Sequence, residues 1–393
     1  MIKRIWFTAL ALVLCATTAH AQDAAAAVKM PNTAGISVNA EAAIVMEAMT
    51  GRVLFAQDVH KRLPIASTTK IMTALLALEQ EEIDAVFEVD ADAIRVEGSS
   101  MGLMEGDKVT LRALAVGMLL SSGNDAANAT AVRLAGTIPA FAQRMNERAR
   151  EIGMKDSSFE TPSGLDGENH YSTAYDMALL AREALRNDRF AEICSQYRLR
   201  TSFGNPPYDR WLTNHNRLLN YYEGTVGVKT GFTKKAGRCL VSSAKRNGVQ
   251  LICVTLDCPN DWSTHENLYN RYFGEIAVED LAQGLPPLHI KVTGGTKEQV
   301  TAVQYEHAQV PVPVRGAKIE YIVKIEPFLY APVRGGQTVG EVRVLLDGRQ
   351  VYELTLQAQE EIPLKHPYDE KTPIWQKIGE WLGGLAERVQ RKQ

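Results

Sequence analysis

Apolar residues recur three and four positions apart from Ser67 onward, directly after Pro64 and a run of small residues. This spacing is typical of an amphipathic helix, and Pro64 is typical of a helix start. The helical pattern continues in most of the chain from Leu75 to about Thr225. Four further helices are predicted there, at Leu111 to Leu120, Ala126 to Leu134, Ile138 to Ile152 and Tyr175 to Leu185.

Runs with strand character flank this helical region. Residues 43–55 predict a β-hairpin around Met49-Thr-Gly51. After the helical region, strands are predicted at Thr225 to Thr233, Cys239 to Ala244 and Val249 to Leu256. Helices between two sets of antiparallel strands predict an α/β domain, with an antiparallel sheet flanked by helices and a helical subdomain.

The composition changes near Pro286-Pro287 to prolines, valines and short alternating runs. These runs predict a small C-terminal all-β sandwich domain. Its strands are expected at Val310 to Val314, Ile319 to Ile325, Thr338 to Leu345 and Arg349 to Leu356, with a tight turn at Asp347-Gly348.

The two ends of the chain predict targeting segments. Lys3 and Arg4, an apolar run and a small-x-small site before Gln22 are typical of a signal peptide. A lipoprotein signal at Cys15 is disfavoured by the bulky Leu14 before it. The protein is therefore expected to be exported.

Residues 372–393 predict an amphipathic tail helix with two tryptophans on its apolar face and a basic end. No apolar run approaches the ~20 residues that span a bilayer, so we expect the helix to lie on the membrane surface. Docking on the protein's own β-domain or on a partner is the alternative. The predicted domain boundaries are 1–21 for the signal peptide, 22–35 for a leader, 36–276 for the catalytic domain, 286–364 for the β-domain and 372–393 for the anchor.

The composition excludes several classes of protein. A net charge of −3 argues against nucleic-acid binding. The histidines are scattered without zinc-binding spacing, so neither a metal nor a cofactor is expected. Four cysteines follow the signal peptide without a Cys-x-x-Cys pair, and we expect them to be buried or free thiols: Cys194, Cys239, Cys253 and Cys258.

Candidate chemistry begins at Ser67. Lys70 lies one helical turn later, so its amine can reach the Ser67 hydroxyl. A serine needs a neighbouring base, and a lysine can serve only if burial or nearby positive charge keeps it neutral. A Ser-x-x-Lys arises by chance on the order of 0.7 times in such a chain. The same spacing at Ser242 and Lys245 lies in a strand, where the two side chains point to opposite faces.

Two further motifs, taken on their own, can also be explained by local structure without a catalytic role. Ser122-Gly-Asn124 follows an apolar helix and is also typical of a helix end followed by an Asx cap. Lys229-Thr-Gly231 is also consistent with a strand edge protected by a lysine, although such a triplet is expected only about 0.1 times per chain.

The three motifs in this order resemble those of penicillin-binding proteins and serine β-lactamases. The residues around these motifs resemble those of the exported D-alanyl-D-alanine carboxypeptidases, the low-molecular-mass penicillin-binding proteins. The resemblance runs from about Ile36 to the C-terminus and includes Ala331 to Glu341, similar to the family's C-terminal β-domain. The four matching segments are Pro64 to Thr73, Ser122 to Ala127, Thr161 to Asp166 and Val228 to Thr233.

The resemblance implies a role for each motif residue. Ser67 would be the acylated nucleophile, Lys70 its base, and Ser122 a proton relay to the leaving amine. Asn124 would position Lys70 and the substrate amide. Lys229 would favour the neutral form of Lys70 and attract the substrate carboxylate, and Thr230 would hydrogen-bond that carboxylate. The backbone N–H groups of Ser67 and Phe232 would form an oxyanion hole. Gly231 completes the implied substrate-binding residues.

The implied activity is removal of the terminal D-alanine from peptidoglycan stem pentapeptides, with β-lactam antibiotics as covalent inhibitors. The implied place is the extracytoplasmic face of the membrane. Relatives also carry an arginine for the terminal carboxylate after the last core strand, and Pro259 to His265 offers none. A β-lactamase is the enzymatic alternative, but Glu160 to Gly164 lacks the asparagine of a deacylation motif. The third alternative is a penicillin-binding sensor without catalytic activity. Such a protein would be expected to lack a key residue in one of the three motifs, and all three motifs are intact.

Overall fold

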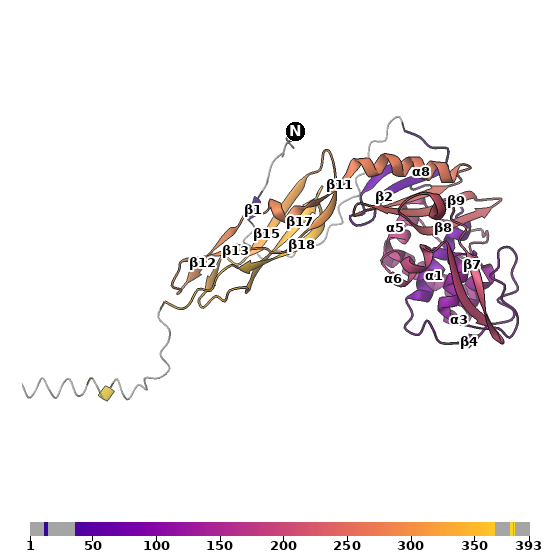
Figure 1. Ribbon diagram of the computed structural model, residues 1–393, viewed down its shortest axis with the longest axis horizontal. Coiled ribbons are helices and arrows are strands. Elements are labelled where there is room, and N and C mark those ends of the chain that lie inside the picture. The colour runs from indigo at the N-terminus through magenta and orange to yellow at the C-terminus, as the bar shows by residue number, and fades with distance from the viewer. Residues whose placement is uncertain (1–11, 15–35, 366–377, 380, 382–393) are drawn as a thin grey trace, which may run out of the picture. The chain divides into compact units, whose positions relative to one another are not determined.

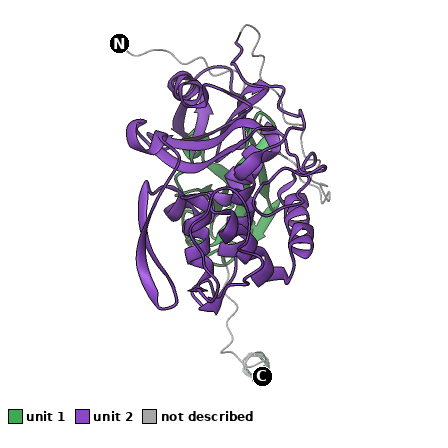
Figure 2. Ribbon diagram, turned by 90° about the vertical axis from the view of Figure 1, so that its right-hand side faces the viewer, with its two compact units in different colours: residues 1–24, 280–309, 318–393 green, residues 25–279, 310–317 purple. Residues whose placement is uncertain are grey.

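The computed structural model describes residues 12–14, 36–365, 378–379 and 381, and it divides into two compact units. Figure 2 colours them separately. The larger unit comprises residues 25–279 and 310–317, and the smaller comprises residues 1–24, 280–309 and 318–393.

The larger unit is built on a five-stranded antiparallel sheet in the order β3-β2-β10-β9-β8. This order makes β8 an edge strand. Figure 1 labels β2, β8 and β9 of this sheet. The predicted antiparallel sheet is confirmed. Its strands are β2 (Ala42–Glu47), β3 (Val53–Gln57), β8 (Thr225–Thr233), β9 (Gly237–Arg246) and β10 (Val249–Leu256).

Helices pack on both faces of this sheet. Because side chains alternate between the faces, Ile44 and Val241 join the core formed with α1 to α6, whereas Val45 and Leu240 join the core formed with α8. The helices are the 3-10 turn η1 (Ala66–Thr69), α1 (Lys70–Leu78), α2 (Leu111–Leu119), α3 (Asn124–Ala135), α4 (Ile138–Ile152), α5 (Ala174–Ala184), α6 (Asp188–Cys194), α7 (Leu218–Tyr221) and α8 (Asp261–Tyr272).

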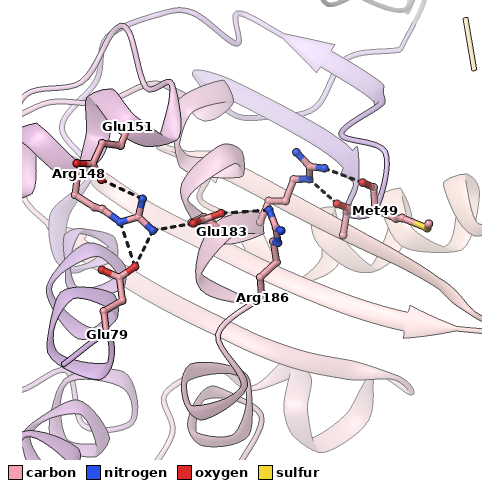
Figure 3. Close-up of polar contacts among 8 residues, drawn as sticks. Met49, Glu79, Arg148, Glu151, Glu183 and Arg186 are labelled. Carbon is pink, nitrogen blue, oxygen red and sulfur yellow. Dashed lines mark hydrogen bonds and ion pairs between the residues drawn. The ribbon is translucent and has the colours of Figure 1, made fainter. Parts of the chain in front are cut away.

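An ion-pair network ties the end of α1 to α4 and α5 (Figure 3). Arg148 of α4 lies 2.7 Å from both Glu79, at the C-terminus of α1, and Glu183 of α5. The Arg148 side chain is only 20 % exposed, so solvent screens these pairs less than ordinary surface pairs. The network holds the helix that carries Lys70 against its neighbours.

The prediction of helix up to about Thr225 is wrong for residues 198–213. There β6 (Arg198–Gly204) and β7 (Pro207–Thr213) form an antiparallel hairpin. Arginines stack on aromatic rings along it, with Arg198 over Trp211 and Arg210 over Phe203. These cross-strand contacts override the weak helical spacing. The signal for a turn was present in Gly204-Asn-Pro-Pro207.

Two short strand pairs and a 3-10 turn complete the larger unit. β4 (Phe87–Glu88) pairs with β5 (Lys108–Val109), and β11 (Ile276–Asp280) pairs with β14 (Gln309–Pro313). A 3-10 turn, η2 (Phe273–Glu275), follows α8.

The smaller unit is all-β, as predicted. Its strands form one sheet in the order β1-β15-β17-β18-β13-β12-β16. They are β1 (Leu12–Leu14), β12 (Leu288–Thr293), β13 (Gln299–Val303), β15 (Ile319–Ile325), β16 (Phe328–Tyr330), β17 (Thr338–Leu346) and β18 (Arg349–Ala358), and η3 (Leu281–Gly284) precedes them. β1 lies within the predicted signal peptide and pairs with β15.

Most of the predicted signal peptide and tail helix lies outside the described residues. In the tail, Ile378, Gly379 and Trp381 are described, as helical, and the Trp381 side chain is 67 % exposed. None of the helices formed by the described residues is long and apolar enough to cross a membrane. Cys194, Cys239, Cys253 and Cys258 are all buried and unpaired, as expected.

Candidate active site

Ser67 lies in the 3-10 turn that leads into α1. The preceding residue, Ala66, has φ of 46°, a left-handed conformation that is unusual for a residue with a Cβ. Positive φ in non-glycine residues concentrates at functional sites. The turn leaves Ser67 half-buried, whereas its neighbours Ala66 and Thr68 are buried.

Lys70 is the first residue of α1 and is completely buried. Its Nζ lies 2.9 Å from Ser67 Oγ, 2.7 Å from Asn124 Oδ1 and 2.7 Å from the backbone carbonyl oxygen of Ser163. Burial and, second, the positive charge of Lys229 hold the pKa of Lys70 well below its ordinary value, while Asp125 opposes them. The contact between Ser67 and Lys70 that was predicted from their spacing is therefore present in the structure.

A helix does end before this motif, but Asn124 does not cap the next one, so the interpretation of the motif as an Asx cap is wrong. The N-cap of α3 is Gly123, without a side-chain cap bond. Instead, Asn124 Oδ1 accepts from Lys70 while Nδ2 donates to the Glu97 carbonyl. The amide is thus fixed from both ends.

Ser122 precedes α3 and has φ of 60°, a second strained conformation beside the site. It is 5 % exposed, and it lines the same pocket as Ser67. The residues between α2 and α3 therefore present a hydroxyl to the nucleophile's pocket.

β8 brings the third motif to the pocket. Lys229 is buried, and its Nζ donates to the Thr230 carbonyl at 2.9 Å. Burial lowers the pKa of Lys229 to about 7. A Cβ at Gly231 would lie 3.1 Å from the Ser67 backbone nitrogen, so glycine allows β8 to approach the nucleophile's turn closely. Phe232 follows, exposed at the pocket.

The loop at residues 160–167 was placed correctly as a loop, but its part in the site was missed. Besides the Ser163 carbonyl on Lys70, the Pro162 carbonyl accepts from Thr73 Oγ1 of α1 at 2.7 Å. Gly164 has φ of 81°, and a Cβ there would lie 2.0 Å from the Ala66 carbonyl oxygen. Backbone groups carry these contacts, so no side-chain motif could reveal them.

A buried histidine holds the same loop. His170 Nδ1 accepts from the Glu160 backbone N–H at 3.0 Å, and its Nε2 lies 2.8 Å from Thr69 Oγ1, next to Lys70. Burial lowers the pKa of His170 to about 4, which keeps the ring neutral and able to accept at Nδ1. His170 thus joins the loop to the nucleophile's turn.

The competing pair at Ser242 and Lys245 is excluded, as predicted. Ser242 is buried in β9, where its Oγ contacts His265 and Tyr269 of α8, and Lys245 is exposed. The two side chains do not meet.

The pocket beside Ser67 has a volume of about 540 Å³. Five of the predicted site residues line it: Ser67, Ser122, Thr230, Gly231 and Phe232. The other lining residues are ones that the sequence did not single out. Those residues are Ser99, His215, Arg217, Arg238, Pro259, Asp261 and Trp262. The described residues contain no group of three His, Cys, Asp or Glu side chains placed to hold a metal ion.

Comparison with known families identifies this constellation. The model of the D-alanyl-D-alanine carboxypeptidase family matches residues 25–260, more than half of the chain. The chain belongs to that family. A second model, the C-terminal domain of penicillin-binding protein 5, matches residues 280–364. Membership makes the chain a serine-type carboxypeptidase of the penicillin-binding protein class, as the motifs predicted.

Individual relatives cover most of the chain. D-alanyl-D-alanine carboxypeptidase DacF of Bacillus subtilis is 31 % identical over 347 residues, which are 84 % of this chain and 87 % of the relative. D-alanyl-D-alanine carboxypeptidase DacC of Escherichia coli is 32 % identical over 83 % of this chain and 85 % of its own. Penicillin-binding protein 5 of Haemophilus influenzae has a similar structure, with a TM-score of 0.63 at 28 % identity over 84 % of this chain and 98 % of its own.

Proposed function

We propose that Ser67 is the nucleophile by which this carboxypeptidase removes the terminal D-alanine from peptidoglycan stem pentapeptides. The observation that carries the proposal is the surroundings of Lys70 Nζ, which contacts the Ser67 hydroxyl and two carbonyl oxygens. A neutral amine has two N–H groups and one lone pair. The N–H groups match the Asn124 and Ser163 oxygens, so the lone pair is left to accept the Ser67 proton.

In the acylation step, Ser67 Oγ attacks the carbonyl carbon of the penultimate D-alanine as its proton passes to Lys70. The bond from that carbon to the nitrogen of the last residue then breaks. The leaving nitrogen takes the proton from Lys70 through the Ser122 hydroxyl, which returns Lys70 to its neutral form, and D-alanine departs as the free amino acid. Hydrolysis reverses the roles: Lys70 takes a proton from water as the water oxygen attacks the acyl carbon, and it returns that proton to Ser67 Oγ as the ester bond breaks.

The oxyanion formed in both steps needs preorganised donors. The backbone N–H groups of Ser67 and Phe232 are proposed for this role. The close approach of Gly231 to the Ser67 backbone nitrogen supports it, because it brings the end of β8 beside the nucleophile's turn. Such donors typically contribute about 10²–10³ in rate. Lys229 and Thr230 are proposed to attract and bond the substrate's carboxylate.

The direct test is mass spectrometry after incubation with a stem pentapeptide mimic and, separately, with benzylpenicillin. We expect loss of one alanine from the peptide and a penicilloyl adduct on Ser67, because the lactam carbonyl mimics the scissile amide. Ser67→Ala should lack both. An adduct on Ser122 or Ser242 instead would contradict the assignment.

We further propose that the protein is exported and held at the extracytoplasmic membrane surface by residues 372–393. The apolar face with two tryptophans and the basic end support this anchor. It would leave the catalytic domain free to work on the wall. The boundaries 36–276 and 286–364 remain our proposal for the catalytic and β-domains.

A further inference from the structure

The pocket wall beyond Phe232 is formed by an arginine from the neighbouring strand. Arg238 of β9 is paired directly with Phe232 of β8, and both residues line the pocket with Ser67. The family resemblance implied an arginine only after the last core strand, and residues 259–265 contain none. The sheet instead supplies one from the strand beside the motif.

The register of β8 and β9 fixes the face on which Arg238 stands. Thr230 pairs with Leu240 and Phe232 pairs with Arg238, so these four side chains share one face of the sheet. Leu240 belongs to the core formed with α8. Arg238 is therefore the diagonal neighbour of Thr230, at a distance that a long side chain can cover. Lys229 and Gly231 belong to the opposite face, that of Ser67.

Two residues at the start of α8 hold the guanidinium in place. Arg238 Nη2 donates to Asp261 Oδ1 at 2.7 Å and to Oδ2 at 2.9 Å, and Nε donates to Oδ1 at 3.2 Å. Arg238 also lies over the Trp262 ring, 5.6 Å from its centroid. The Asp261 side chain is 3 % exposed, whereas that of Arg238 is 41 % exposed. The ion pair that holds Arg238, here called the clamp, therefore has a buried carboxylate, whereas part of the Arg238 side chain remains exposed.

The open edge suits an anion. Among the hydrogen bonds of the described residues, none uses Arg238 Nη1, which keeps two N–H donors for a ligand. Arg217 also lines the pocket, but no ion pair among the described residues holds its guanidinium in a fixed position. A carboxylate between Thr230 and Arg238 would meet a hydroxyl and a charged donor, and charge-assisted bonds of this kind are the stronger ones.

We propose that Arg238, oriented by Asp261, binds the terminal carboxylate of the stem peptide and thereby sets the enzyme's preference for a free C-terminus. This inference rests on the proposed function, since the peptide must lie along the edge of β8 with its scissile carbonyl at Ser67. From there its carboxylate reaches the face of Thr230 and Arg238. Asp261 acts as a positioning residue, and Trp262 limits the movement of the guanidinium.

The test compares two substrates that differ only at the C-terminus: a stem pentapeptide mimic with a free carboxylate and the same peptide as its C-terminal amide. The measured quantity is the ratio of their kcat/KM values, with kcat and KM reported separately. Arg238→Gln should lower kcat/KM for the free acid by about 30-fold or more, mainly through KM, and leave the amide almost unchanged. Arg238→Lys should restore part of the ratio, because a point charge replaces the fork.

Asp261→Asn tests the clamp without removing the arginine. It should lower the acid-to-amide ratio by about 10-fold, because Arg238 is then free to turn away. Arg217→Gln is the matched control, a pocket arginine with no ion pair among the described residues, and it should change the ratio by less than about 3-fold. Thermal unfolding of each variant establishes that it is folded.

Two results would overturn the inference. One is a folded Arg238→Gln or Arg238→Lys enzyme with the wild-type ratio; the other is a larger loss of the ratio in Arg217→Gln. Failure of the proposed function is separate, because the wild-type enzyme would then hydrolyse neither peptide and would not be acylated at Ser67.

Discussion

At the scale of single residues, Lys70 is the group on which the chemistry depends. It is buried, and its two carbonyl partners would satisfy the N–H groups of a neutral amine. The positive charge of Lys229 favours the same state. Among the described residues, the hydrogen-bond partners of the Lys70 amine therefore include no carboxylate that would hold it in the charged form.

Lys70→Arg tests this description. The change keeps a positive side chain in place but should lower the rate of penicillin acylation by at least about 10³-fold, because arginine does not give up its proton at neutral pH. Stopped-flow acylation followed by intact-mass measurement would determine the rate. Acylation near the wild-type rate would place the base elsewhere.

The pH dependence provides a second test at this scale. Activity should fall at low pH as Lys70 gains a proton, and at high pH as Lys229 loses its charge from a pKa of about 7 in the free enzyme. A bound carboxylate stabilises the charged form of Lys229 and raises its pKa. The alkaline limb of kcat should therefore lie at higher pH than that of kcat/KM, which reports the free enzyme. Coincident alkaline limbs would argue against an electrostatic interaction between Lys229 and the substrate carboxylate.

At the scale of elements, the site is a junction of three segments that approach through backbone atoms. The turn before α1 and the turn before α3 both carry positive φ, at Ala66 and Ser122. The loop at residues 160–167 packs on the first of these turns so closely that Gly164 has no room for a Cβ. This packing is what sets the Ser163 carbonyl against Lys70.

Gly164→Ala should therefore damage catalysis more than folding. The new methyl group would push the loop from the Ala66 turn and move the Ser163 carbonyl, and a misplacement of about 1 Å can cost about 10²-fold in rate. Gly153→Ala is the matched control, because Gly153 also has positive φ, at 90°, but nothing lies near its Cβ. Both variants should lose about 1 kcal/mol or more of stability, since both strain a left-handed residue. Steady-state kinetics and thermal unfolding separate the effects, and equal kcat values in the two variants would contradict this account.

At the scale of the whole molecule, the chain joins a catalytic unit to an all-β unit and a tail. All the groups proposed for bond making and breaking lie in the larger unit, within residues 67–232. The tail should accordingly serve location and not chemistry.

Deletion of the chain from Thr372 onward tests this division. The truncated protein should no longer sediment with anionic liposomes, because the apolar face and basic end that favour the membrane surface are removed. Its hydrolysis of the pentapeptide mimic in solution should stay within about 2-fold of the wild type. Liposome binding that survives the deletion would place the membrane contact in another part of the chain.

The sequence by itself determined the features that depend on short-range geometry. A separation of three residues in a helix places Ser67 and Lys70 on one face. The alternation of apolar and polar residues predicted the strands of the sheet, and β8 and β10 form at the predicted residues. The order of the three motifs also indicated the family, because their joint spacing carries more information than any one of them.

Only the tertiary structure decided which distant groups complete the site. Asn124 and Ser163 meet Lys70 from positions 54 and 93 residues away, and one of these contacts is made by a backbone carbonyl, which every residue has. Arg238 reaches the pocket because β9 pairs with β8, and Asp261 holds it from the start of α8, which follows β10. Such contacts depend on strand register and helix packing, which local residue patterns do not specify.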